Sequence, residues 1–235
     1  MIATFVWIER RVRQPILPLR LLASRARAGA YLARMLFLGG AVGFWFFSTQ
    51  FLQGVLHLRP LQAGLAFLPV TLPNFASAMA VPRLARRFGN EKLLLVGLLL
   101  GVLGLLWLGL ADAHSSYWMH VAPPMLLIGL GQGLLLAPLT AAGVAGVAPE
   151  DAGAASGMVN VAHQLGGALG LGLLVLVFAS AAPPAAHDSA AALAHRISAV
   201  MNTGALLLGL ALLVSWAFIV LPRRGAQPKP QEALS

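Results

Sequence analysis

One uninterrupted apolar run constrains this chain more than any other feature. No Asp, Glu, Lys or Arg occurs between residues 152 and 187, and a helix of about 20 apolar residues is long enough to cross a bilayer. The run nevertheless contains Asn160, His163 and Gln164 near the expected middle of the membrane. Positions i, i+3, i+4 and i+7 share one face of a helix, so these three residues and Gly167 are predicted to lie on the same side.

A polar face of this kind needs partners inside a membrane. Burying amides and an imidazole in lipid without hydrogen bonds costs several kcal/mol, so the face should look into protein or into a water-filled path. Two interpretations stay open from the residues alone. The face lines a solute pathway, or it forms hydrogen bonds between helices and binds no ligand.

Glycines on the same run predict close packing between helices. Gly153 and Gly157 are four residues apart, and so are Gly166 and Gly170. Small residues at this spacing allow two membrane helices to approach closely. We therefore expect helix contacts at both pairs, and at Gly167 beside them.

The composition places the whole chain in a membrane. Hydrophobic residues make up 59% of the 235 residues and charged residues 10%, whereas soluble domains carry about 25% charged residues. The net charge of +9 does not indicate nucleic acid binding, because the basic residues cluster in short segments between apolar runs. There is no cysteine, which excludes disulfides and thiolate metal sites.

The order of apolar and polar segments predicts an all-α bundle of six transmembrane helices. Residues 1–8 are interpreted as the tail of a preceding helix whose start is missing, residues 9–34 as a basic connector, and residues 222–235 as a disordered tail. Between them, the bundle of residues 35–221 contains the spans 35–58, 61–81, 93–111, 118–142, 152–181 and 197–221.

The basic residues predict how the bundle is oriented. With six spans, 14 of the 16 Lys and Arg residues fall on one side of the membrane, and only Arg59 and Arg196 fall on the other. Cytoplasmic loops are enriched in Lys and Arg. We therefore expect a multi-pass protein of the plasma (inner) membrane with both termini in the cytoplasm.

The acidic and histidine residues argue against an enzyme. All seven acids lie at span ends or in loops, and no carboxylate pair or nucleophile motif occurs inside the membrane. His187, Asp188 and His195 match no compact metal-ligand spacing, so we expect a solvated loop, no metal and no bound cofactor. His163 is the one ionisable group away from the span ends that is a candidate for proton exchange, although a neutral, hydrogen-bonded histidine is the more common case in a buried setting.

Seven polar residues are candidates for a substrate pathway. Besides the three residues on the fifth span, Gln50 and Gln53 could instead be interfacial, Asn74 could satisfy backbone groups freed by nearby prolines, and Gln132 could act in helix packing. The complete candidate set is Gln50, Gln53, Asn74, Gln132, Asn160, His163 and Gln164.

Four segments resemble the major facilitator superfamily, in particular the C-terminal half of its fourteen-helix drug:proton antiporters of the EmrB/QacA type. They are Glu9-Arg-Arg-Val-Arg-Gln-Pro15 followed by Leu19-Arg-Leu-Leu, then Gln53-x6-Pro60-Leu-x-Ala-Gly64-x4-Pro69, Leu84-Ala-Arg-Arg-Phe-Gly89, and Ala154-Ala-Ser-Gly157-x2-Asn160-x3-Gln164-Leu-Gly-Gly167. The resemblance implies two inverted three-helix repeats, and a missing N-terminal helical bundle as partner.

The chain also departs from the family's pattern. Arg86 stands where the cytoplasmic loop motif has Asp, Pro82 where it has its first Gly, and Gly129 where another family motif has Arg. The residues Arg83, Arg86, Arg87, Gly89 and Lys92 are first of all topology determinants. A role as a latch at a cytoplasmic gate is implied only by the resemblance.

The resemblance implies a proton-coupled exporter of hydrophobic or cationic small molecules that works by alternating access, with the proton gradient as energy source. Two other interpretations remain. The chain is a six-helix membrane protein or gene remnant without transport of its own, or it is an uptake permease for an organic solute.

Overall fold

The computed structural model describes residues 20–181 and 189–221, and in these two ranges all regular secondary structure is helical. Six helical segments are long and apolar enough to cross a membrane, so the predicted all-α bundle of six spans is confirmed. They are Arg25–Val55, Pro60–Phe88, Asn90–Leu108, Tyr117–Gly143, Pro149–Ser180 and Ser189–Val220.

Several spans are built from more than one helical element. The elements are α2 (Arg20–Ala23), α3 (Arg25–Gln50), η1 (Phe51–Val55), α4 (Pro60–Leu65), α5 (Leu68–Phe88), α6 (Asn90–Leu108), η2 (Tyr117–Val121), α7 (Ala122–Gly143), η3 (Pro149–Asp151), α8 (Ala152–Ser180), α9 (Ser189–Ser215) and η4 (Trp216–Val220). The predictions for residues 1–19 and 222–235 lie outside the described residues.

Three span boundaries differ by seven or more residues from those predicted from the sequence. The first span begins at Arg25 rather than at residue 35, the second ends at Phe88 rather than at residue 81, and the last begins at Ser189 rather than at residue 197. The early start is possible because basic side chains in α3 find acceptors: the Arg27 guanidinium donates to the carbonyl oxygen of Ala145 at 3.1 Å. Arg34, assigned to the connector from the sequence, therefore lies inside α3.

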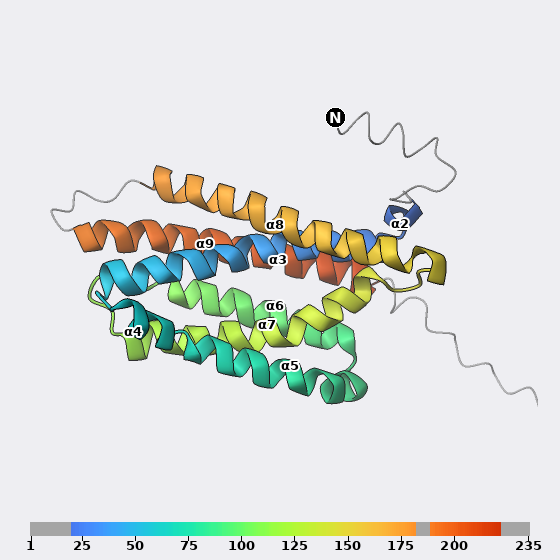
Figure 1. The fold of residues 1–235 in the computed structure, drawn as a ribbon, viewed down its shortest axis with the longest axis horizontal. Coiled ribbons are helices and arrows are strands. Elements are labelled where there is room, and N and C mark those ends of the chain that lie inside the picture. The colour runs from blue at the N-terminus through green and yellow to red at the C-terminus, as the bar shows by residue number, and fades with distance from the viewer. Residues whose placement is uncertain (1–19, 182–188, 222–235) are drawn as a thin grey trace, which may run out of the picture.

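The spans run up and down between two ends of the bundle (Figure 1). We call one end the basic end, because Arg83, Arg86 and Arg87 lie there in the last two turns of α5 and Lys92 in the first turn of α6. These four residues, predicted to form a loop, are therefore helical, and only Gly89 separates the two helices. The start of α3 and the α7–α8 loop lie at this same end, on the right in Figure 1. The short helix α4 and the α6–α7 loop lie at the opposite end.

The packing pattern relates the first three spans to the last three. The first unit consists of α3, α5 and α6, and the second of α7, α8 and α9. The first helix of each unit packs most extensively on the second and third helices of the other unit: α7 on α5 and α6, and α3 on α8 and α9. Exchanging the units converts one set of contacts into the other. Because α3 begins at the basic end and α7 at the opposite end, the arrangement is that of two inverted three-helix repeats.

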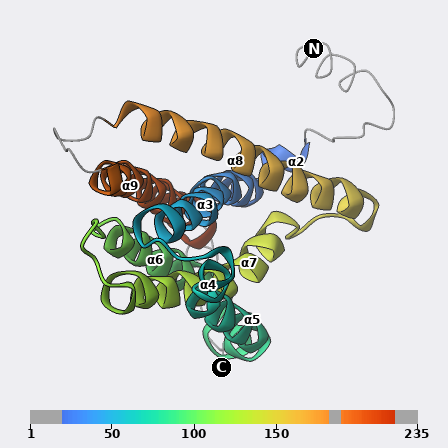
Figure 2. The same cartoon turned by 60° about the vertical axis from the view of Figure 1, so that its left-hand side comes forward.

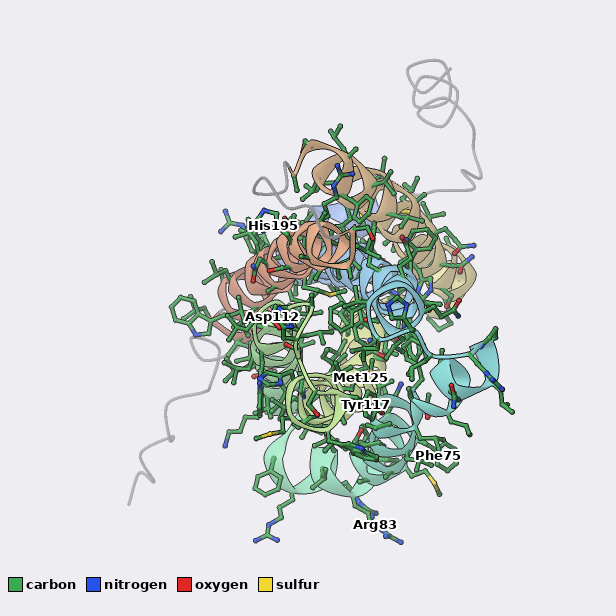
Figure 3. The ribbon with its side chains drawn as sticks, turned by 90° about the vertical axis from the view of Figure 1, so that its left-hand side faces the viewer. Phe75, Arg83, Asp112, Tyr117, Met125 and His195 are labelled. Atoms are coloured by element: carbon green, nitrogen blue, oxygen red, sulfur yellow. The ribbon has the colours of Figure 1, made fainter. Side chains whose placement is uncertain are left out.

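The buried core lies along α3, α6, α7 and α9. Phe44 and Phe47 of α3, Leu98 of α6 and Met125 of α7 are among the largest fully buried side chains, and Figure 3 shows Met125 in the interior. By contrast, α5 and α8 bury only 22% of their most apolar stretches, against 61% for α3. Both lie at the outside of the bundle (Figure 2).

The glycine-rich segment of α7 is explained by its contacts with α5 and α6. A Cβ added to Gly129 would collide with the backbone of Val70, and one added to Gly133 would collide with Ser77 and the carbonyl oxygen of Asn74. Only residues without a side chain allow the two backbones to lie this close. A Cβ added to Gly131 would instead collide with the backbone of Gly97 in α6, so the sequence Gly129-Leu-Gly-Gln-Gly133 is a packing feature between α7 and both α5 and α6.

Candidate functional site

Helix α8 separates a packed face from an open face. The packed face consists of small and branched residues that repeat every three or four positions and are buried, namely Ala155, Val159, Ala162, Gly166, Gly170 and Leu174. Asn160 and Gln164 fall on the open face and are exposed, whereas His163 is half-buried at the border between the two. The predicted polar face of the fifth span therefore exists, and it is directed away from the packed face.

His163 belongs to a group of three side chains from three helices, which we call the polar cluster. The Arg34 guanidinium of α3 donates through Nη1 to Thr140 Oγ1 of α7 at 2.8 Å, and its Nη2 lies 3.4 Å from His163 Nδ1 of α8. Thr140 Oγ1 in turn donates to the carbonyl oxygen of Leu136 at 2.8 Å. Both contacts of Arg34 join residues that are more than 100 positions apart in sequence.

The depth of the polar cluster follows from its positions along the helices. Arg34 is the tenth residue of α3, which at 1.5 Å per residue places it about 14 Å from the helix start. A transmembrane helix needs about 30 Å to cross the hydrocarbon core, and the first span has 31 residues, about 46 Å. The span is thus about 16 Å longer than the core requires, and the polar cluster lies in the half nearer the basic end, close to the boundary of the hydrocarbon core.

The other predicted pathway residues lie apart from the polar cluster. Gln50 and Gln53 lie near the opposite end of the first span, half-buried and exposed respectively. Gln132 is buried in α7, and the partly buried Asn74 lies on the facing helix α5. The structure thus divides the seven candidates into a group at the opposite end of the first span, a group between α5 and α7, and a group on α8. Of the seven, only His163 makes a side-chain contact within the polar cluster.

The basic end carries the residues predicted for the gate loop. Arg83, Arg86, Arg87 and Lys92 are all exposed, and Figure 3 shows Arg83 pointing away from the helices. Gly89 adopts a φ of +84°, which favours glycine, and it ends α5. Arg86 and Arg87 in the last turn of α5 face the negative end of its helix dipole.

The glycines of α8 differ in what they contact. A Cβ added to Gly166 would lie 2.5 Å from the Cα and carbonyl oxygen of Met35, and one added to Gly170 would collide with the backbone of Gly39. Gly167 has only the Val42 side chain at 3.4 Å. Around Gly153 and Gly157 nothing described lies within 4 Å, because both are on the open face. For this pair, the expectation of helix packing is corrected within the described bundle.

The α6–α7 loop at the opposite end carries one defined carboxylate. The Ser115 hydroxyl and the His114 backbone N–H each donate to Asp112 Oδ1 at 2.9 Å. These two hydrogen bonds, first that from Ser115, hold the pKa of the Asp112 carboxyl below its ordinary value of 3.8. His195 lies in α9, while His187 and Asp188 are outside the described residues. In the described ranges, no three His, Cys, Asp or Glu side chains are grouped so that they could hold a metal ion.

Sequence reasoning missed Arg34 and Thr140. Arg34 immediately precedes a charge-free run, and the absence of charge predicts that the helix begins with that run. A helix continued backwards by three turns places this arginine inside the membrane-spanning helix, as the structure does. Thr140 gave a weaker signal, because a hydroxyl in a membrane helix commonly bonds only to its own backbone.

Comparison with known proteins identifies related chains. Residues 4–171 match the family model described as Major Facilitator Superfamily. The puromycin resistance protein pur8 of Streptomyces alboniger is 39% identical over 197 residues, which cover 82% of this chain and 39% of the relative. The cephamycin export protein CmcT of Amycolatopsis lactamdurans is 38% identical over 178 residues, covering 75% of this chain and 37% of the relative.

A third relative is the multidrug efflux pump LfrA of Mycolicibacterium smegmatis, 32% identical over 176 residues, which cover 75% of this chain and 35% of the relative. The chain thus spans well under half the length of the relatives it matches. The relatives' names describe resistance, export and efflux.

Proposed function

Because the chain belongs to the major facilitator superfamily, a family of transporters rather than enzymes, we propose that it is the C-terminal helical bundle of a drug:proton antiporter. Two observations support this proposal. Similar proteins are named for drug export or resistance, and four sequence segments resemble the C-terminal half of the fourteen-helix EmrB/QacA-type transporters. The described part of the chain forms one six-helix unit.

The observation that carries the proposal is the open face of α8. Asn160 and Gln164 are exposed there, inside a span that is long and apolar enough to cross a membrane. Amides facing lipid are costly, so a second protein surface or a water-filled path has to cover them. A second helical bundle on this face would create a polar passage between the two bundles.

Transport in this arrangement is proposed to occur by alternating access. The bundle would rock as a rigid body against its partner, opening the passage to one side of the membrane and then to the other. The packed core of α3, α6, α7 and α9 supplies the rigidity, because tightly packed interiors do not deform continuously. The basic end is proposed to face the cytoplasm, as the positive-inside rule requires.

The proton gradient is the proposed energy source. Within the described residues all four acids lie at helix ends or in loops, namely Glu91, Asp112, Glu150 and Asp151. His163 is the described ionisable group nearest the passage that can change charge near neutral pH. We propose that the carboxylate that couples transport to protons lies in the partner bundle, with His163 as a hydrogen-bonding member of the passage wall.

Replacing the open-face amides tests the proposal. The variants Asn160→Leu and Gln164→Leu, introduced into the complete transporter, should reduce drug export from cells while the amount in the membrane is unchanged. Asn202→Leu is the matched control, because this amide is exposed on α9, away from α8's open face. Vesicle flux with and without an imposed proton gradient then measures the coupling. Normal export by both α8 variants would contradict a passage along this face.

A further inference from the structure

The polar cluster offers hydrogen-bond donors to a ligand and few acceptors. Arginine has five N–H donors and no acceptor. Arg34 directs two of its nitrogens to Thr140 and His163, and its Nε is buried without a hydrogen-bond partner. Because a guanidinium can only donate, His163 Nδ1 must be the acceptor in this contact, so the neutral ring carries its proton on Nε2. His163 therefore adds another N–H donor to the cluster.

No anion in the described bundle balances this positive charge. The described acids lie at helix ends or in loops, and none of them pairs with Arg34 in the described residues. An arginine that a membrane-spanning helix partly withdraws from water normally pairs with an acid or with carbonyl groups, because an uncompensated charge there is costly. Among the described residues, the cluster therefore has no anionic partner.

The surroundings of the cluster suit the remaining parts of an amphiphilic molecule. Thr140 is exposed beside Arg34, and the Asn160 and Gln164 amides are exposed within one turn of His163. On the same helix, Val161 and Leu165 leave 46% and 47% of their surface exposed. Polar donors and apolar side chains therefore occur together near the charged group, as in sites that bind a small molecule with one polar end.

We propose that Arg34 and His163, with Thr140 as the positioning residue, bind the carboxylate of an amphiphilic molecule that the transporter carries. Thr140 holds the guanidinium by accepting from Nη1, and the ligand would bind the Nη1 and Nη2 hydrogens that Thr140 and His163 leave unused, together with the His163 Nε2–H, because Arg34 Nε is buried. Planar guanidinium and carboxylate groups form paired, charge-assisted hydrogen bonds. This inference rests on the proposed function, and it replaces the expectation of a cationic substrate with an anionic one.

The test measures binding rather than export. The full chain, purified in nanodiscs of phosphatidylcholine, is titrated with pyrenebutyrate and with its neutral amide, pyrenebutyramide. Fluorescence anisotropy reports binding, and empty nanodiscs give the background from partition into lipid. We expect the carboxylate to bind about tenfold more tightly than the amide or better, since a hydrogen bond to a charged group is worth at least this factor.

Three variants assign the preference to the cluster. Arg34→Gln should bind the carboxylate and the amide equally. Arg34→Lys keeps the positive charge but lacks the planar guanidinium group, and should retain part of the preference for the carboxylate over the amide. Arg83→Gln removes an exposed arginine at the basic end and should leave the preference unchanged. Circular dichroism and size-exclusion chromatography show whether each variant is folded. If Arg34→Gln does not fold, Arg34→Lys still tests the inference, because it keeps the positive charge.

Several results would overturn the inference. Equal binding of the two probes by the native chain would do so, as would a preference that survives Arg34→Gln. Loss of the preference in nanodiscs of phosphatidylglycerol, measured at about 0.5 M salt so that the charge of the lipid surface is screened, would mean that an anionic lipid headgroup occupies the cluster instead. Failure here leaves the proposed function intact, because the export assay with Asn160→Leu and Gln164→Leu does not depend on ligand charge.

Discussion

Replacing Gly166 with alanine should destabilise the bundle, whereas the same change at Gly172 of the same helix should not. The new Cβ at position 166 would lie 2.5 Å from both the Cα and the carbonyl oxygen of Met35. Ordinary contact for such atoms begins at 3.4 Å, so α3 and α8 must separate by about 0.9 Å at this crossing. At Gly172 no described atom lies within 4 Å of the added Cβ.

The expected magnitude comes from two opposing effects. Alanine favours a helix over glycine by up to about 1 kcal/mol at either position. Overpacking a well-packed contact costs about 1–3 kcal/mol, and this cost applies only at position 166. Since the helix-propensity gain is common to both variants, Gly166→Ala should be less stable than Gly172→Ala by about 1–3 kcal/mol.

The assay is reversible unfolding of the purified chain by sodium dodecyl sulfate in mixed micelles, followed by the intrinsic fluorescence of its tryptophans. Gly170→Ala, which meets the backbone of Gly39, serves as an independent second case and should also destabilise. Equal free energies of unfolding for Gly166→Ala and Gly172→Ala would refute the reasoning, because the α3–α8 contact would then tolerate a side chain at its closest point.

Two further predictions concern the ends of the bundle. For Asp112, a carbon-13 titration of the carboxyl should give a pKa below 3.8, which Ser115→Ala raises. Because the folded pKa is lowered, the carboxylate stabilises the loop above that value and loses the effect as pH falls through the folded pKa. An unchanged titration in Ser115→Ala would argue against the hydrogen bond as the cause of the lowered pKa. The second prediction concerns the orientation of the bundle in the membrane. Because the chain has no cysteine, a single cysteine introduced as Asn90→Cys or His114→Cys is the one thiol that can be labelled. An impermeant maleimide should label position 114 in intact cells and position 90 only after lysis, and the reverse pattern would disprove a cytoplasmic basic end.

The open face of α8 shows how far sequence reasoning reaches in this protein. The spacing of Asn160, His163 and Gln164 correctly predicted that they share one side of a helix, since helical geometry depends only on residue separation. Spacing carries no information on what lies opposite that side. The structure shows His163 beside Arg34, while Asn160 and Gln164 are exposed.

By itself, the sequence determined the number of spans, the all-helical class and the family. Lipid provides no hydrogen-bond partners, so each long apolar run has to form a helix whatever its neighbours are. Only the tertiary structure decided which glycines make contacts. Gly153 and Gly157 have the same spacing as Gly166 and Gly170, yet only the second pair meets α3. It also decided that Arg34, Thr140 and His163 meet, because a contact between residues far apart in the chain depends on how whole helices pack and not on local pattern.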